Sequence, residues 1–215
     1  MSKQRDIPVF SHPLIETHCH LDYLPGDVLE TALQNAQAVN VERIITIGVS
    51  PTNQATVLQL ATHYPQVWGT QGIHPHDAHD FDDAVENVIR DHALHPKICA
   101  IGEIGLDYYY DHSDRTKQRA AFERQLQIAI DLALPVVIHA RDADADTQAI
   151  LRNFVGQMPK RGVIHSFTAG QALAEYCLAE GFCLGFNGIS TFNKADNVRQ
   201  IAALTTVEQI LLETD

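Results

Sequence analysis

The chain has 215 residues, a net charge of −12 at pH 7 and a hydrophobic content of 45%. This length is enough for one domain with a substantial core, and we expect a single domain over residues 1–215. The 15 Lys and Arg residues against 27 Asp and Glu residues argue against a protein that grips long duplex DNA through a broad basic surface. A bound metal ion can still hold a polyanionic substrate locally, because it is often the largest charge in its site.

The cysteines and the N-terminal segment indicate the cellular compartment. The four cysteines form no C-x-x-C pair and lie in apolar stretches, as buried reduced thiols do in a reducing cytoplasm. The segment MSKQRDIPVFSHP lacks the apolar core of a secretion signal, and no later apolar run reaches membrane-spanning length. We therefore expect a cytoplasmic protein that is not attached to a membrane and has no stable protein partner.

Short apolar runs rich in β-branched residues alternate along the chain with longer segments of helical periodicity. The predicted strands are 14–21, 43–49, 67–73, 97–104, 135–140, 162–166, 182–187 and 209–215. The segments between them, such as 120–133, place apolar residues three and four apart, as an amphipathic helix does. Because a helix separates each strand from the next, neighbouring strands should be parallel.

Eight strands in strict alternation with helices predict an α/β fold, a (β/α)₈ barrel of the TIM type. A doubly wound open sheet is the structural alternative, but the chain has neither a G-x-G-x-x-G motif nor a P-loop after an early strand. The last predicted strand ends at Asp215, so the last outer helix is missing from this chain. We expect a C-terminally truncated chain; the alternative is a partner that covers the gap between the first and seventh helices.

Six potential metal ligands fall at the C-terminal ends of predicted strands, where βα barrels carry their reactive groups. They are His18 and His20 at the first strand, Glu103 at the fourth, His139 at the fifth, His165 at the sixth and Asp215 at the eighth. Alternate residues of a strand face the same side, so His18 and His20 should aim both imidazoles at one ion while Cys19 faces away. This mixed set of nitrogen and oxygen ligands suits Zn²⁺, Mn²⁺, Co²⁺ or Mg²⁺ better than Ca²⁺.

Each of these residues also has a purely structural interpretation. A single histidine at the end of a buried strand is usually a hydrogen-bonded core residue, and Glu103 alone could be an internal ion-pair partner. The conjunction of all six favours a metal site, because unpaired buried carboxylates and imidazoles would otherwise cost several kcal/mol each. His74 follows the third predicted strand and is a candidate substrate contact, with His76 a weaker one. The remaining histidines should be solvent-exposed, namely His12, His63, His79, His92, His95 and His112.

Seven sequence motifs occur in a recognisable order. They are ETHCHLD (16–22), GIHPH (72–76), IGEIGLDYYYD (101–111), LPVVIHARDA (134–143), HSFT (165–168), GFNGISTFNKA (185–195) and LLETD (211–215). In this order they resemble the TatD-related DNases, which are metal-dependent hydrolases of the amidohydrolase-like superfamily. The resemblance covers the whole chain after about the first dozen residues.

The resemblance implies a somewhat distorted βα barrel that hydrolyses phosphodiester bonds of DNA with one or two divalent ions. The ligand sets it implies are His18, His20 and Asp215 for one ion, and His139 and His165 for the other, with Glu103 as the bridge. Asp215 would also orient or deprotonate the attacking water, and His74 would contact the substrate phosphate. Chains of this family continue beyond the aspartate that Asp215 matches, which supports the truncation.

We predict a deoxyribonuclease that uses metal-activated water, with Asp215 and Glu103 as its catalytic carboxylates. The acidic composition favours attack on single strands or strand ends, as by a 3′–5′ exonuclease. Arg141 shares the facing of His139 and could bind the phosphate. The alternative for Arg141 is an ion pair with Asp107 or Asp142.

Two other functions stay open at this point. A metal-dependent deacylase or esterase, such as a D-aminoacyl-tRNA deacylase, would use the same ligands, because they do not distinguish carbonyl from phosphorus. A non-catalytic metal-binding scaffold is the second alternative. Loss of a ligand would be its signature, and all six ligand positions hold a ligand residue.

Overall fold

The computed structural model describes residues 7–215 and contains eight parallel strands that alternate with helices. The strands are β1 (Leu14–Cys19), β2 (Val41–Thr46), β3 (Val67–Gln71), β4 (Ile98–Asp107), β5 (Val136–Arg141), β6 (Gly162–Ile164), β7 (Cys183–Phe186) and β8 (Ile210–Leu212). Each strand pairs with the next one in the chain, from β1 to β8. The predicted barrel is confirmed, and each predicted strand overlaps an observed one, although the eighth ends at Leu212 rather than at Asp215.

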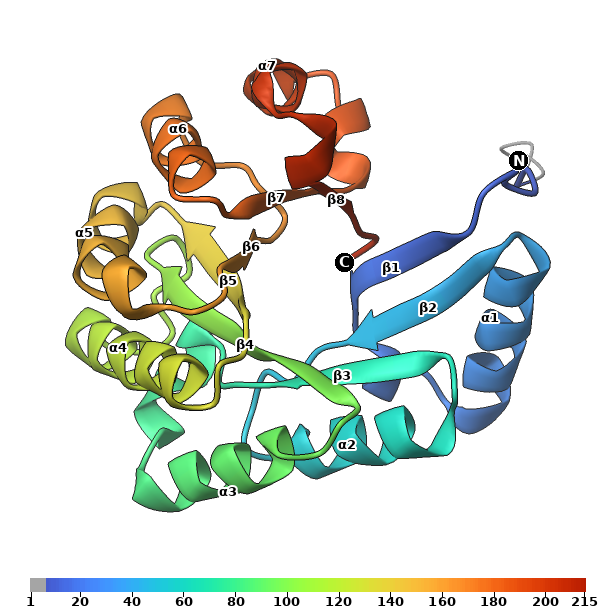
Figure 1. Cartoon of the computed structure of the whole chain (residues 1–215), viewed down its shortest axis with the longest axis horizontal. Coiled ribbons are helices and arrows are strands. Elements are labelled where there is room, and N and C mark those ends of the chain that lie inside the picture. Colours follow the sequence, from blue (N-terminus) through green and yellow to red (C-terminus); the bar gives the residue numbers. More distant parts are fainter. Residues whose placement is uncertain (1–6) are drawn as a thin grey trace.

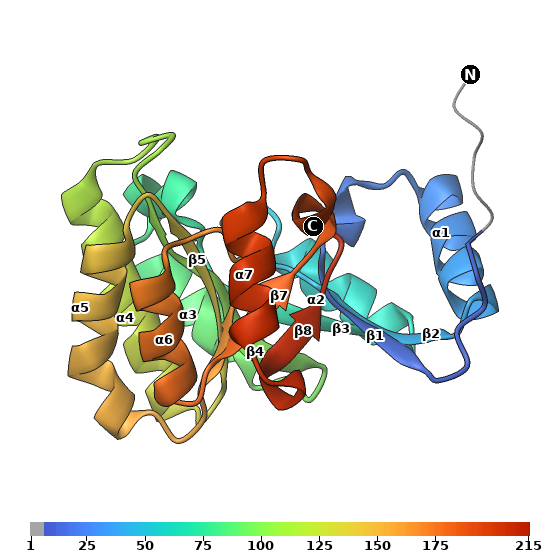
Figure 2. The same ribbon diagram turned by 90° about the horizontal axis from the view of Figure 1, so that it is seen from above.

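The helices lie outside the ring of strands (Figure 1). The α-helices are α1 (Gly26–Ala38), α2 (Gln54–His63), α3 (Asp83–Ala93), α4 (Arg115–Asp131), α5 (Asp144–Phe154), α6 (Gln171–Ala179) and α7 (Asp196–Leu204). Short 3₁₀ helices are η1 (Leu21–Tyr23), η2 (Pro75–Asp80), η3 (Val155–Gln157), η4 (Gly188–Thr191) and η5 (Val207–Gln209). Within residues 7–215, α7 is the last α-helix and β8 the last strand. Figure 2 shows α4, α5 and α6 side by side, with α1 at the opposite end of the molecule.

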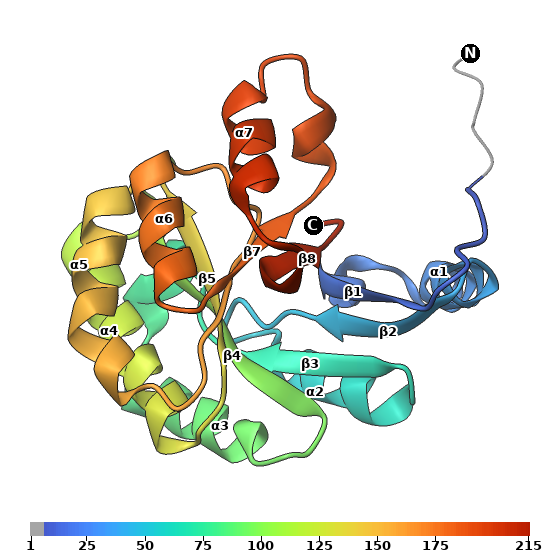
Figure 3. The ribbon, with the colours of Figure 1, turned by 45° about the horizontal axis from the view of Figure 1, so that its top comes forward.

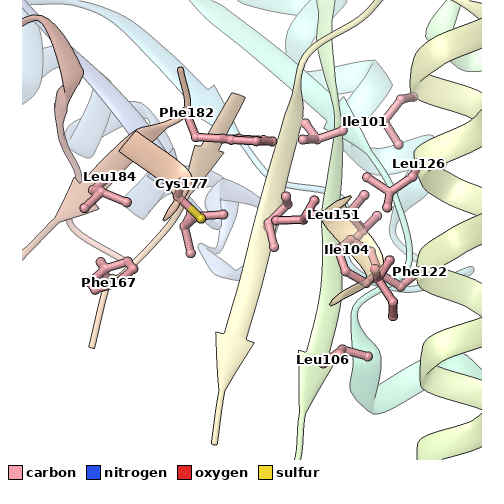
Figure 4. Packing of buried hydrophobic residues seen from close by; sticks show 14 of the residues in the cluster. Ile101, Ile104, Leu106, Phe122, Leu126, Leu151, Phe167, Cys177, Phe182 and Leu184 are labelled. Atoms are coloured by element: carbon pink, nitrogen blue, oxygen red, sulfur yellow. The ribbon is translucent and has the colours of Figure 1, made fainter. Parts of the chain in front are cut away.

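The main core lies between the strands and the helices on the side of α4, α5 and α6. Figure 4 shows Phe122 and Leu126 of α4 close to Ile104 of β4, and each of these three side chains is fully buried. Burying one such side chain contributes about 1.5–3 kcal/mol. A separate, smaller cluster underlies α1 and includes Leu29 and Leu33. The helices therefore cover the outer face of the strands, and the inner face of the strands carries a different set of side chains.

Inside the barrel, small apolar residues form the floor beneath the mouth. Ala100 of β4, Val137 of β5 and Val163 of β6 make one buried cluster there. Side chains of a strand alternate between its two faces, so the residues two positions further along point inward again, one layer higher. In β5 and just after β6 these residues are His139 and His165. The apolar floor thus lies directly beneath a layer of titratable side chains that includes His139 and His165.

The first and last strands meet through side-chain and loop hydrogen bonds. Thr17 Oγ1 of β1 donates to the carbonyl oxygen of Leu212 in β8 at 2.8 Å. Beyond β8, Thr214 N donates to Glu16 Oε1 at 3.0 Å, and Asp215 N donates to the carbonyl of His18 at 3.2 Å. Figure 3 shows the C-terminus in this position, between β8 and β1. These contacts form the seam between β8 and β1, and they hold Asp215 against the end of β1.

The prediction that Glu103 ends the fourth strand is wrong, because β4 continues to Asp107. β3 pairs with β4 only as far as Ile101, whereas β5 stays paired with β4 up to Asp107. The register between β4 and β5 shifts between Ile101 and Ile104, the stretch that contains Glu103. Glu103 therefore lies inside a long strand, yet at the level where the neighbouring β3 has already ended.

Two other expectations from the sequence can be compared with the structure. All four cysteines are free thiols, and Cys177 alone among them is fully buried. Among the helices of residues 7–215, none has the length and apolar character needed to span a bilayer.

Candidate metal centre

A hollow of about 270 Å³ opens at the mouth of the barrel, at the C-terminal ends of the strands. We call it the histidine basin, and its lining includes His20, His74, His76, Glu103, His139, His165 and Asp215. His18 belongs to the same cluster but is fully buried, with its ring stacked on that of His165 at a centroid distance of 4.0 Å. The structure thus brings together all six predicted ligands and both histidines of the GIHPH motif.

Strand geometry explains the pair on β1. His18 Nε2 and His20 Nε2 lie 3.8 Å and 3.6 Å from the same atom, Asp215 Oδ1. Cys19, between them, packs instead against the apolar cluster under α1. The facing predicted for this H-x-H pair is therefore observed.

Glu103 occupies the centre of the basin. Its Oε1 lies 2.6 Å from His165 Nε2, 3.0 Å from His139 Nδ1 and 3.4 Å from His74 Nε2. Its Oε2 lies 3.4 Å from His18 Nε2. Burial alone would raise the pKa of Glu103, but the surrounding histidines, His165 first, hold that pKa well below its usual range. Glu103 is thus an ionised carboxylate encircled by imidazoles.

Asp215 closes the basin from the side of the seam. Its side chain is 29% exposed, in contrast to 4% for Glu103, so water can reach it. The hydrogen bond with His20 is the main cause that holds the pKa of Asp215 below its ordinary value. Asp215 is therefore an accessible carboxylate at neutral pH.

Asp107 is a fully buried carboxylate of the site that the sequence analysis did not single out as a functional residue. Its Oδ2 lies 3.0 Å from both His139 Nε2 and His76 Nε2, and its Oδ1 accepts hydrogen bonds from the backbone N–H groups of Tyr109 and Tyr110. Despite burial, these hydrogen bonds lower the pKa of Asp107. A period of two from Glu103 reaches Asp107, so facing parity was the signal that could have found it.

The contacts of His139 fix the role of each of its ring nitrogens. A carboxylate can only accept, so in the metal-free protein His139 Nε2 donates a hydrogen to Asp107 and His139 Nδ1 donates one to Glu103. A metal ion would take the place of the hydrogen on Nδ1, the nitrogen that faces Glu103 and His165. A carboxylate on the far nitrogen is the usual support of a metal-binding histidine.

Three groups of three residues place their potential ligand atoms within 4.8 Å of one another. They are His18, His20 and Asp215; His18, Glu103 and His165; and His74, Glu103 and His139. Glu103 is common to two groups, as a bridging carboxylate would be. The grouping differs from the sets implied by the resemblance in two respects: His165 lies with His18, and His74 joins the ligand atoms.

The residues present fit a divalent ion. In the described part of the chain, His18 Nδ1, His18 Nε2, His20 Nδ1 and His165 Nδ1 are buried without a hydrogen-bond partner. A buried polar atom left unsatisfied costs about 1–3 kcal/mol. Burial lowers the pKa of His74 and of His165, which favours the neutral imidazole that binds metal.

Arg141 lies at the end of β5 but outside the basin. Its guanidinium stacks over the ring of Tyr109 at 4.4 Å and faces that of Tyr110 at 5.1 Å. Within residues 7–215 it forms no ion pair with Asp107 or Asp142, so that alternative is wrong. Its guanidinium lines a neighbouring hollow together with Asp142.

The histidines expected at the surface divide into two groups. His12, His63, His79 and His112 are exposed, and His79 also contacts Ser113. His92 and His95 are only partly exposed, against expectation, because His92 Nδ1 bonds to Gln71 Oε1 at 2.9 Å and His95 Nδ1 accepts from the backbone of Lys97. Neither contact follows from the local sequence pattern.

A family model described as TatD related DNase matches residues 15–215, which include every residue of the histidine basin. The chain belongs to the TatD-related DNase family. It is 33% identical to an uncharacterized metal-dependent hydrolase, YabD of Bacillus subtilis, over 94% of this chain and 79% of that protein. It is 34% identical to the 3′-5′ ssDNA/RNA exonuclease TatD of Escherichia fergusonii, over 84% of this chain and 69% of that protein.

Solved structures agree with this membership of the TatD family. The crystal structure of YJJV, a TatD homolog from Escherichia coli K12, superimposes with a TM-score of 0.87 at 32% identity. The alignment covers 94% of this chain and 78% of that one. The chain is therefore a TatD-family metal-dependent hydrolase with a TIM-type barrel, and its His, Glu and Asp clusters could hold metal.

Proposed function

We propose that this TatD-family chain hydrolyses phosphodiester bonds of DNA, acting on single strands or strand ends in the 3′-to-5′ direction. The observation that carries the proposal is the central Glu103 carboxylate, which has imidazole nitrogens on several sides and the water-accessible Asp215 nearby. The relative named as a 3′-5′ ssDNA/RNA exonuclease, at 34% identity, supports the choice of substrate.

One or two divalent ions would occupy the basin. Mg²⁺, Mn²⁺, Zn²⁺ and Co²⁺ all accept a mixed set of nitrogen and oxygen ligands. The residues that would hold them are His18, His20, Glu103, His139, His165 and Asp215, with His74 in reach of Glu103. When bound, such an ion supplies Lewis acidity, which makes water acidic enough to act as a nucleophile near pH 7 and polarises the phosphate.

The protein side chains provide the proton transfer and the positioning. Asp215 is ionised and exposed enough to accept a proton from the attacking water, a contribution of about 10²–10⁴ in rate for a positioned base. Glu103 holds the two halves of the ligand set together. His74 would contact the phosphate or join the ligands, and Arg141 would bind a phosphate just outside the basin.

The acidic character of the chain selects the form of the substrate. With a net charge of −12, there is no excess of cations to neutralise many phosphates along a duplex. Attraction for DNA would come from the ions in the basin and from local contacts beside it. This arrangement suits a strand end, where a few phosphates suffice.

The test is a cleavage assay with 5′- and 3′-labelled single-stranded DNA, and the same sequence as RNA, in each of the four metal ions. We expect a ladder that shortens from the 3′ end, depends on added metal, and is abolished by excess chelator. His139→Ala and Glu103→Ala should lose activity, whereas the control His63→Ala, at an exposed site on α2, should keep it.

Two results would contradict the proposal. Equal cleavage in saturating chelator, or full activity of both basin variants, would show that the basin is not the catalytic site. No cleavage of either nucleic acid, together with metal-dependent hydrolysis of an acyl ester of tRNA, would replace the nuclease by a deacylase.

A further inference from the structure

A second hollow, of about 470 Å³, opens beside the histidine basin. It shares His139, His165 and Asp215 with the basin, so the two are continuous at the metal ligands. Its volume lies within the range of about 300–1,000 Å³ that is usual for small-molecule sites. A ligand placed on the basin can therefore extend into this hollow.

The walls of the second hollow carry exposed aromatic side chains. Tyr109, which follows β4, is 58% exposed, and Phe192, which follows η4, is 63% exposed. We call this hollow, with Tyr109, Arg141, Ile189 and Phe192 in its walls, the aromatic groove. Large aromatic rings left in water beside a reactive centre are available to stack on a ligand.

Arg141 gives the groove a cation. Its guanidinium carbon lies 4.4 Å from the centre of the Tyr109 ring, a cation–π contact that restrains its planar fork of N–H donors. Asp142 and Asp215 also line the groove, so its charge is not strongly positive. A polyanion held by charge alone would bind such a groove poorly, whereas stacking on a ring does not depend on charge.

We infer that the aromatic groove is a nucleobase subsite, in which bases next to the scissile phosphodiester stack on Tyr109 and Phe192 while Arg141 binds the adjacent phosphate. The inference rests on the proposed function and adds the substrate form to it. Every base has a π-face, so binding by stacking tolerates any sequence. In a duplex both faces of each base are covered by neighbours, and the groove therefore selects unpaired strands.

The test compares Tyr109→Leu and Phe192→Leu with wild type on a single-stranded oligonucleotide and on the same strand made abasic next to the cleaved bond. Phe10→Leu is the matched control, since Phe10 is also exposed but bonds through its backbone to Val39 and Asn40 near the start of the chain. In wild type the abasic strand should show a KM about 5- to 150-fold higher, the range that one base–aromatic contact produces. In the two groove variants this difference should shrink toward one, because the partner of the base is gone.

A second readout reports stacking without turnover. A phosphorothioate-linked strand with 2-aminopurine at the tested position resists hydrolysis, and its fluorescence should be quenched on binding to wild type and to Phe10→Leu. The quenching should be lost in Tyr109→Leu and in Phe192→Leu. Both variants should keep the unfolding temperature of wild type, which shows that they are folded.

The outcomes separate the two proposals. If wild type cleaves DNA but the variants keep both the abasic difference and the quenching, the base subsite is wrong and the nuclease stands. If wild type cleaves no nucleic acid under any metal, the proposed function fails and the subsite fails with it.

Discussion

The apolar core and the innermost part of the histidine basin, formed by His18 and Glu103, are buried to a similar extent but are built from opposite chemistry. Phe122 and Leu126 have no exposed surface and belong to one large apolar cluster. His18 and Glu103 are also almost fully buried, yet they are titratable, and both ring nitrogens of His18 lack a hydrogen-bond partner in the described part of the chain. We therefore expect the core to supply stability by itself, and the basin to reach its full stability only with a bound ion.

The largest expected effect comes from the centre of the basin. Glu103→Gln keeps the shape of the side chain but removes the charge that two ligand groups share. We expect kcat to fall by about 10²–10⁴, because positioning and activation of water are both lost. Thermal unfolding with and without Mn²⁺ should show that the increase in stability caused by the metal is lost as well. If Glu103→Gln kept this increase in stability, Glu103 would not contribute to metal binding.

A change in the core should give the converse result. Leu126→Ala removes a fully buried side chain and should lower the free energy of unfolding by about 2–5 kcal/mol. Chemical denaturation measures this loss, and Leu126→Met, which conserves volume, should cost less than about 1.5 kcal/mol. The stabilisation of Leu126→Ala by Mn²⁺ should equal that of wild type. If it did not, core and basin would not be independent.

Asp107 tests whether the support of His139 matters. Asp107→Asn removes the charge of the carboxylate that accepts the hydrogen of His139 Nε2, with little change in volume. We expect metal affinity or activity to drop by about 10- to 100-fold, as is typical for the carboxylate behind a metal-binding histidine. Asp91→Asn, at an exposed site on α3, is the control. An Asp107→Asn protein with unchanged metal affinity would show that the hydrogen bond is only structural.

The pH dependence of metal binding gives the smallest effect. Burial lowers the pKa of His139, but hydrogen bonds to Asp107 and Glu103 outweigh it and raise the pKa to about 9. The raised value stabilises the metal-free protein below pH 6.5, and this contribution is lost as the pH rises through about 9. An ion must displace that proton, so metal affinity should rise about tenfold per pH unit up to pH 9. Calorimetry in buffers of different ionisation enthalpy measures the released proton, and no release near pH 7.5 would contradict this assignment.

Much of the architecture could be predicted from periodicity and residue type. The alternation of apolar runs with helical segments predicted every strand, and a period of two predicted that His18 and His20 face one way and Cys19 the other. These features depend on local rules, namely the facing of strand residues and the position of reactive groups at strand ends. Predicting these features did not require knowing how far each strand extends past its neighbours.

The remaining features depend on tertiary pairing. The extension of β4 to Asp107 follows from its pairing with β5, which the residues of β4 alone do not specify. The facing of Asp107 follows from the period of two, but its contact with His139 depends on that same pairing. Arg141 stacks on Tyr109 rather than joining an acidic residue, because the loop after β4 brings the ring over the guanidinium. Such contacts between segments distant in sequence have no signature in a single chain.

The most direct test of the account is the number of metal equivalents bound by the purified protein after incubation with Mn²⁺ or Zn²⁺ and removal of free ion. The account predicts at least one equivalent per chain for wild type, and a clear reduction for Glu103→Gln and His139→Ala. It also predicts that a metal ion at a hundredfold excess over its Kd raises the free energy of unfolding by about 2.7 kcal/mol. The unfolding temperature should rise accordingly. Fewer than about half an equivalent in wild type, with no shift in unfolding temperature, would contradict the claim that the histidine basin is a metal centre.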